Sequence, residues 1–319
     1  MSRTAKTWLI VAGILVVLGP ILIVIGAAAG GVKFSGEGNY ETKTYEITAT
    51  FDQIAVTTDV TDIELATADE KQCRVVCDEA EGRENSAEVQ DGTLVIKSQD
   101  NRKWFDRLTS LSMRSPKIRV YLPQKMYSSL TIYTDTGDVI IPKGMEFGKA
   151  EIKGDTSDVS CLADVKDSVK IDCGTGDVVL GGKIGMATVT TSTGDIDIIS
   201  ADSTADISVN TDTGDVTMKT VSCSALNLES TTGDQTLTDV VASGDMNIRS
   251  TTGDVVFEHS DAENITVNTT TGDVTGTLRS DKIFSTDTAT GDVNVQSAAN
   301  GGKCEIKTST GDIAISISK

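Results

Sequence analysis

Residues 246–257 read MNIRSTTGDVVF, and they carry the pattern that decides the fold. The triplet at 252–254 is one of nine Thr-Gly-Asp copies, and a tenth copy at 156–158 reads Thr-Ser-Asp. Consecutive copies lie 18 to 20 residues apart, a period typical of solenoids, in which each repeat stacks on the next. The ten aspartates are Asp138, Asp158, Asp177, Asp195, Asp215, Asp234, Asp254, Asp273, Asp292 and Asp312.

Each copy is numbered here from its Asp as position zero. Positions −8 and −6 are apolar in nearly every copy, as in Met246 and Ile248, and position −7 is always polar. This alternation is typical of a strand with one buried face. Positions +1 and +3 are apolar again, as in Val255 and Phe257. Since three residues separate −2 from +1, a flat strand would place them on opposite faces, so Gly-Asp is predicted to turn a corner.

The sequence therefore predicts an all-β fold, a single-stranded parallel β-solenoid (β-helix) of about 19 residues per coil. We expect it to cover residues 45–319, with an irregular part at 66–125 and regular Thr-Gly-Asp coils at 126–319. The same frame recurs around Asp62, with Ile54 before it and Ile63 after it. Three residues depart from the pattern: Ser157 replaces Gly, Gln235 stands at +1 and Gly276 at +3.

The N-terminus is predicted to anchor the chain in a membrane. Residues 7–29 are uncharged and long enough to span a bilayer as a transmembrane α-helix. Arg3 and Lys6 precede them, so residues 1–6 are expected to be cytoplasmic and the C-terminal domain extracytoplasmic. Residues 30–44 form a polar, glycine-rich linker. The alternative is a cleaved signal peptide, because Ala27-Ala28-Ala29 resembles a cleavage site.

The charge narrows the choice of partners. The formal net charge is −19, and every acidic residue follows residue 30. Such a field repels nucleic acid, so nucleic-acid binding is not expected.

The coil motif resembles a known family. Tandem Thr-Gly-Asp-Val coils, preceded by the strand IRVYLP at 118–123 and by an N-terminal membrane segment, are similar to the bacterial putative-adhesin family. The resemblance covers residues 45–319 and implies an extracytoplasmic β-solenoid domain of unknown function, often encoded among envelope-stress genes. It brings no catalytic residues.

The Asp column is the first candidate for chemistry. Stacked carboxylates repel one another unless they are hydrogen-bonded or neutralised. One interpretation is a ladder of calcium sites, and the other is that each Asp locks its corner through backbone hydrogen bonds. We favour the second, because one Asp per coil supplies too few ligands, and we expect neither a metal nor a cofactor. The Thr residues at −4 and −2 share the parity of the core positions, so both are expected to point inward rather than form an outward ice-binding plane.

Cysteine and histidine point to no active site. Cys73 and Cys77 lie too far apart along one strand for a disulfide. Buried thiols are the expectation, although an inter-layer disulfide such as Cys161–Cys173 stays open. His259 is the sole histidine, so no catalytic residues are assigned and the protein is not expected to be an enzyme.

Two segments could take part in binding. Residues 101–115 interrupt the repeat with Trp104 and several bases, and this loop could dock a polyanion or carbohydrate, or cover the open end of the solenoid. At the C-terminus the alternation runs through Ile313, Ile315 and Ile317 with no cap after it. An open last layer predicts end-to-end self-association or docking of a partner strand.

The predicted function is a membrane-anchored cell-surface module, adhesin-like, structural or binding, without catalysis. Its partners would be the membrane, through the N-terminal helix, and a cell-wall, carbohydrate or protein ligand. The alternatives are an envelope-stress accessory or sensor protein, and a carbohydrate-active enzyme on a β-helix.

Overall fold

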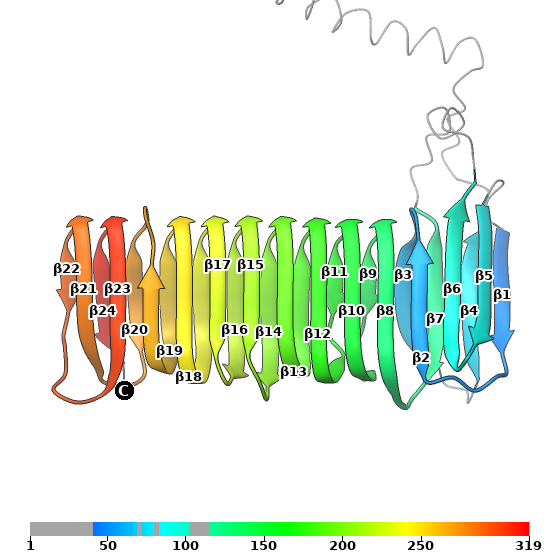
Figure 1. Ribbon diagram of the computed structural model, residues 1–319, viewed down its shortest axis with the longest axis horizontal. Coiled ribbons are helices and arrows are strands. Elements are labelled where there is room, and N and C mark those ends of the chain that lie inside the picture. The colour runs from blue at the N-terminus through cyan, green and yellow to red at the C-terminus, as the bar shows by residue number, and fades with distance from the viewer. Residues whose placement is uncertain (1–40, 69–71, 80–82, 102–114, 319) are drawn as a thin grey trace, which may run out of the picture.

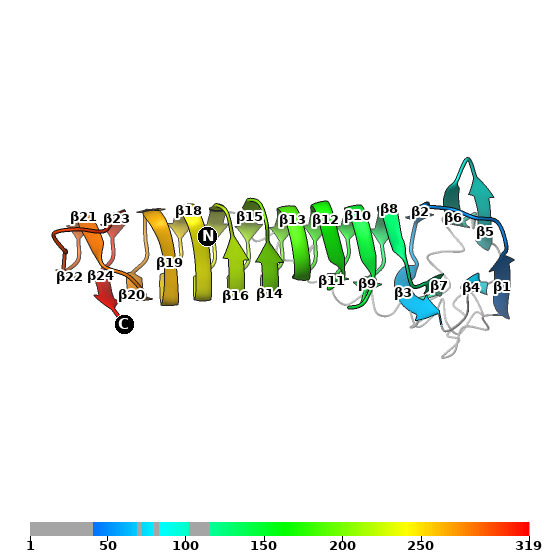
Figure 2. The same ribbon diagram turned by 90° about the horizontal axis from the view of Figure 1, so that it is seen from below.

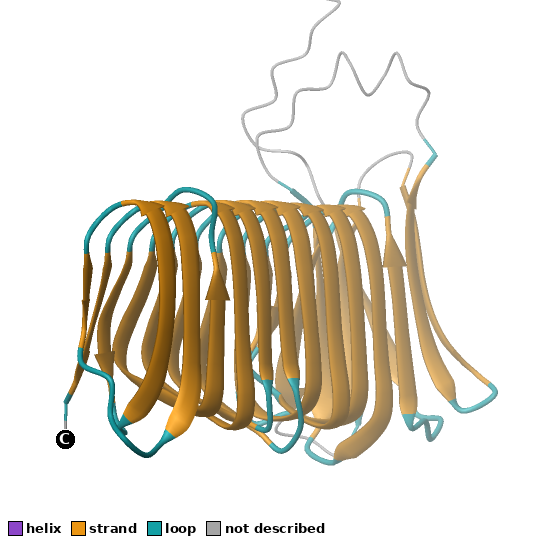
Figure 3. Ribbon diagram, turned by 60° about the vertical axis from the view of Figure 1, so that its left-hand side comes forward, coloured by secondary structure: helices purple, strands orange, loops and turns teal. Residues whose placement is uncertain are grey.

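The computed structural model describes residues 41–68, 72–79, 83–101 and 115–318. These residues form β-strands and no helix, and the strands stack into one long rod (Figure 1, Figure 3). The all-β solenoid predicted from the repeat is confirmed. The strands are β1 (Glu41–Ile47), β2 (Gln53–Thr58), β3 (Asp62–Ala68), β4 (Cys73–Glu79), β5 (Arg83–Gln90), β6 (Thr93–Asp100), β7 (Lys117–Pro123), β8 (Met126–Thr136), β9 (Val139–Ile141), β10 (Glu146–Thr156), β11 (Val159–Cys161), β12 (Asp164–Thr175), β13 (Val178–Thr193), β14 (Ile196–Ser203), β15 (Ile207–Thr213), β16 (Val216–Cys223), β17 (Leu226–Thr232), β18 (Gln235–Thr252), β19 (Val255–Asn268), β20 (Val274–Leu278), β21 (Lys282–Thr290), β22 (Val293–Val295), β23 (Gly302–Thr310) and β24 (Ile313–Ile317).

The predicted membrane anchor at 7–29 and the basic segment 102–114 lie outside the described residues. Within the part of the chain that the structure describes, no helix is long and apolar enough to cross a membrane.

The coil around Asp215 shows how one repeat is built. Strand β15 forms its first side, and Gly214, with φ of +145°, turns the corner into β16. A second bend follows at Thr220, which has φ of +56° and divides β16 into two short segments. The Gly-Asp corner was predicted from the sequence, but the second bend at +5 was not. Four coils place a non-glycine residue in the left-handed region there: Ser200, Thr220, Asp239 and His259.

The coils stack in register, so each column of side chains packs on itself. Val209 of β15 pairs in parallel with Val189 of β13 and with Leu228 of β17, all of them at −6. Val209 is 1% exposed, and Met218 at +3 is fully buried. One continuous hydrophobic core therefore runs along the rod, built from aliphatic columns in the way the alternation predicted.

The prediction for position −2 was wrong. Thr211 at −4 is 1% exposed, whereas Thr213 at −2 lies on the surface. The residue between them, Asp212, is exposed as well. The inward and outward alternation of the strand thus ends at −4, and the next two residues, at −3 and −2, both point outward. The Thr column at −2 faces solvent beside the Asp column, and the Thr-x-Thr pairs form no common outward plane because −4 points inward.

The N-terminal end of the rod is closed by antiparallel strands. β2 lies between β6 and β8, and β3 between β7 and β9, all in parallel pairing. Outside this layer β5 pairs antiparallel with β6, β4 with β7, and β1 with β4 (Figure 2). The predicted turn at Asp91-Gly92, with φ of +48° and +77°, joins β5 to β6.

The C-terminal end differs from the expectation that Ile313–Ile317 forms the last layer. β23 lies between β19 and β21, and β24 between β20 and β22. The last strands in the sequence are therefore inserted one layer below the end, and Ile313 and Ile315 are only 0% and 3% exposed. Since every coil carries the same columns, the pattern does not fix the order of stacking. The outermost coil is β21–β22 (Figure 1).

The corner glycines give a direct test of the stacking. A Cβ on Gly214 would lie 2.0 Å from the carbonyl oxygen of Gly194 in the neighbouring coil. We expect Gly214→Ala to lower the free energy of unfolding by about 2–4 kcal/mol, from backbone strain and this clash together. Gly92 also has positive φ, +77°, but a Cβ added there would meet no atom within 4 Å. Gly92→Ala, measured in the same urea titration, should cost clearly less, and equal costs would contradict the stacking explanation.

Candidate functional site

The aspartates of the repeat form a hydrogen-bonded ladder along one edge of the rod. The N–H of Asp215 donates to Oδ1 of Asp195 at 2.8 Å, and the N–H of Asp234 donates to Oδ1 of Asp215 at 2.8 Å. The same bond joins every neighbouring pair of coils from Asp62 to Asp292, at 2.8 to 3.2 Å. The Asp carboxylates do accept backbone hydrogen bonds, but the expectation that each locks its own corner was wrong, because each accepts from the adjacent coil.

The ladder also shows why the carboxylates tolerate one another. They stand at an exposed corner about 4.8 Å apart, where water screens their repulsion. Asp62, at the N-terminal end of the ladder, is partly buried, and burial raises the pKa of its carboxyl group, with the charge of Asp138 adding to the rise. Among the described residues, no group of three or more His, Cys, Asp or Glu side chains is arranged to hold a metal ion.

We expect calcium to be unnecessary for the fold. Every carboxylate of the ladder except that of Asp292 at the outermost coil accepts a backbone N–H, so excess EDTA should leave the melting temperature of the chain unchanged within error. Circular dichroism melts with EDTA and with added calcium check this. A large drop with EDTA that calcium restores would make the ladder a metal site.

Ser157 replaces the corner glycine with a compensating change nearby. Its side chain is 3% exposed and so points into the corner. Position −4 of the same coil is Gly154, and a Cβ there would lie 2.7 Å from both Cβ and Oγ of Ser157. Ser157 thus fills the space that a side chain at −4 takes in the other coils, so this departure preserves the packing.

Gln235 introduces an amide into an aliphatic column. It stands at +1, is fully buried, and neither its Nε2 nor its Oε1 has a hydrogen-bond partner among the described residues. The nearby −4 hydroxyls of Thr211, Ser230 and Ser250 are also buried without a partner there. Nothing in the structure explains why an amide occupies this position.

An unpartnered buried amide costs stability, so its removal should increase stability. The two coils next to Gln235 carry Val216 and Val255 at the same position. We therefore expect Gln235→Val to raise the free energy of unfolding by about 1–3 kcal/mol. Urea unfolding of the two proteins measures the difference. A destabilised Val variant would show that the amide has a binding partner inside the rod.

The cysteines and the histidine form no reactive cluster in the described chain. All six cysteines are free and buried, so the possible Cys161–Cys173 disulfide is not formed. Burial raises the pKa of the thiols, to about 11 for Cys161 and Cys173 and to about 12 for Cys304. His259 lies exposed at a second bend, with its Nε2 3.4 Å from Oγ of Ser318. This arrangement pairs the histidine with neither a carboxylate nor a thiol.

A shallow hollow lies on the outer face of the first side of the coils. Here Asn247 Nδ2 donates to Asn227 Oδ1 at 3.0 Å, and Arg249 pairs with Glu229 at 2.8 Å. The hollow beside them has a volume of about 370 Å³ and is lined by threonine, serine and asparagine as well as this ion pair. It is a polar, nearly neutral surface on an acidic rod.

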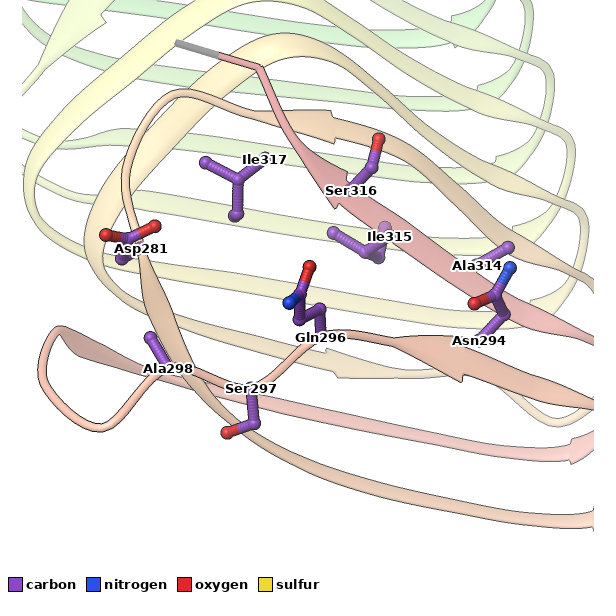
Figure 4. Close-up of a pocket in the computed structure, with 9 residues that line it drawn as sticks. All are labelled: Asp281, Asn294, Gln296, Ser297, Ala298, Ala314, Ile315, Ser316 and Ile317. Atoms are coloured by element: carbon purple, nitrogen blue, oxygen red, sulfur yellow. The ribbon is translucent and has the colours of Figure 1, made fainter.

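A larger hollow of about 820 Å³ lies at the C-terminal end, in the mouth of the solenoid (Figure 4). Ile315 and Ile317 of β24 line one side, and Gln296 and Ser297, which follow β22, line the other. β22 pairs only with Ile313–Ile315, so the coil above is too short to cover Ile317. This mouth combines apolar side chains and amides at the end of the rod.

The amino-acid sequence matches the model of one protein family. The model of the Toastrack DUF4097 family matches residues 51–207 and 199–319. This match confirms the resemblance to the putative-adhesin family. No curated protein matches the chain.

Several solved structures resemble this one at low identity. A putative adhesin from Bacteroides fragilis is 13% identical, covers 88% of this chain and 99% of its own, and gives a TM-score of 0.42. A putative adhesin from Parabacteroides distasonis is 12% identical, covers 87% and 98%, and gives 0.45. A putative lipid binding protein from the same species is 16% identical, covers 88% and 98%, and gives 0.32.

Proposed function

The chain belongs to the Toastrack DUF4097 family, and on that premise we propose that it is a cell-envelope protein, anchored by residues 7–29, whose solenoid serves as an adhesin-like structural or binding module rather than as an enzyme. The observation that carries this proposal is the uniform rod. From Asp138 to Asp312 the coils repeat the same Asp corner and, apart from the open outermost coil, the same buried columns. A catalytic site needs a local constellation of acid, base or nucleophile, and the described coils build ladders instead.

The two ends of the rod support the binding role. The described chain enters at β1, in the closed antiparallel end, while the larger hollow lies at the opposite end (Figure 1). A rod anchored through its N-terminus would hold the mouth away from the linker. The acidic surface keeps such a module soluble and excludes polyanionic partners.

Surface labelling of intact cells tests the location. We expect a membrane-impermeant amine reagent to label exposed lysines of the solenoid, and the chain to sediment with membranes, because the anchor exports everything after residue 30. A variant lacking residues 7–29 should remain inside the cell, unlabelled. An intact chain that stays in the soluble cytosolic fraction would contradict the proposal.

A further inference from the structure

The outermost coil, β21–β22, lacks the cover that every inner coil has. β21 pairs only with β23 and β22 only with β24, so among the described strands nothing pairs with their outer edges. Val293 stands at +1, a position that is fully or almost fully buried in the other Thr-Gly-Asp coils, yet it is 46% exposed. Ile283 stands at −9, an outward position like that of Met186 in an inner coil, and is 42% exposed. The hollow of Figure 4 opens beside these strands.

The aspartate ladder ends at this coil with an unused acceptor. The N–H of Asp292 donates to Asp312 Oδ1 at 2.8 Å, but no N–H of the described chain donates to the carboxylate of Asp292. The start of the outer edge of β21 is already bonded, since the N–H of Phe284 donates to Ser297 Oγ at 3.0 Å and the N–H of Ala298 donates to the carbonyl of Lys282 at 2.9 Å. Beyond Phe284, one further extended strand would supply both the N–H for Asp292 and the missing backbone pairing. The edge is therefore built to accept a strand.

The charge of the outermost coil specifies the kind of strand. Residues 280–301 hold three acids, Asp281, Asp287 and Asp292, and one base. That base, Lys282, is 2% exposed and bound to Asp261 at 2.6 Å, so it does not offset the surface charge. Lys307 of the neighbouring β23 lies opposite Asp287 but is itself paired with Glu305, so the surface here keeps an acidic excess. An acidic edge with exposed Val293 and Ile283 favours a segment that mixes basic and apolar side chains.

This chain carries one segment of that chemistry, residues 102–114. It holds four bases and one acid in a protein of net charge −19. Its apolar residues are Trp104, Phe105, Leu108, Leu111 and Met113. Its charge and its apolar residues are thus both complementary to the outermost coil.

The segment cannot reach the outermost coil of its own rod. It is held between β6 and β7 at the N-terminal end. Fully extended, residues 101–115 span roughly 50 Å, and a loop with both ends held together reaches about half of that. The outermost coil lies eleven stacking steps away, about 53 Å at 4.8 Å per step. Contact between the two requires two molecules.

We propose that β21–β22 binds residues 102–114 of a second copy of the chain, so that rods join head to tail. The added segment lies along the outer edge of β21–β22, places its bases near Asp287 and Asp292, and covers Val293 and Ile283. Because the two surfaces differ, the contact is heterologous and each copy keeps one free end, so association continues into rows. The proposal needs no assumption about location, and it can stand or fall separately from the membrane anchor.

A peptide of residues 101–115 with a fluorescent label tests the contact against the full-length chain in detergent. We expect saturable binding by fluorescence anisotropy, weakened by salt because charges contribute. Asp287→Lys with Asp292→Lys should weaken binding by about tenfold or more. The matched control, Asp135→Lys with Asp212→Lys, makes the same charge change at exposed positions of inner coils and should bind like the unmodified chain.

Three results would overturn the proposal: no binding, equal loss in both double variants, or equal binding of a scrambled peptide of the same composition. Circular dichroism melts establish that each variant is folded. Sedimentation of the full-length chain gives a second readout that leaves the end coil intact. Replacing Arg102, Lys103, Arg107 and Arg114 by Glu should abolish concentration-dependent association, and association that persists unchanged would contradict the head-to-tail contact.

Discussion

The close approach of neighbouring coils at the Gly-Asp corner is the constraint on which the rest of the rod depends. At Gly214, Gly233 and Gly253 alike, an added Cβ would stand 2.0 Å from the glycine oxygen of the adjacent coil. No side chain fits at these three glycines. Their φ near +140° is a second reason, because residues other than glycine rarely adopt it. The Asp that follows then bonds its own coil to the next through the backbone. The corner glycine allows neighbouring coils to approach closely, and the aspartate keeps them in register through its hydrogen bond.

Register at the corner determines what the other columns can be. With equivalent residues stacked on one another, a column inside the rod is either buried or exposed throughout, and aliphatic residues suffice for the core. The exceptions follow the same rule. Ser157 is accepted because Gly154 makes room for it, and the Asn247–Asn227 pair extends a ladder on the outside. Uniform columns present the same side chains along the described rod, and the surfaces that differ from this pattern lie where the stacking stops.

Sequence reasoning recovered what repeats and missed what happens where repetition ends or bends. Val209 and Met218 were placed in the core by alternation alone, since that signal recurs in every coil. Thr213 was misplaced because parity counts residues but does not show where a strand begins to turn. The second bend was missed because Ser200, Thr220 and His259 share a backbone conformation and no side-chain chemistry.

The insertion of β23–β24 beneath β21–β22 follows from the same uniformity. Because the coils carry the same buried columns, exchanging two of them changes the packing of the core little. The order of stacking can therefore differ from the order of the sequence. In the observed order the last strands of the sequence are paired on both sides, and β2–β3 near the other terminus is paired on both sides as well. Neither of these segments can fray without breaking two sets of backbone bonds. The open edge that every finite solenoid must have is thereby moved from the C-terminus to β21–β22, an internal segment joined to the rod at both of its ends. Such an edge can bind a strand without exposing a chain end, which makes it better suited to an interface than the last layer of a rod stacked in sequence order.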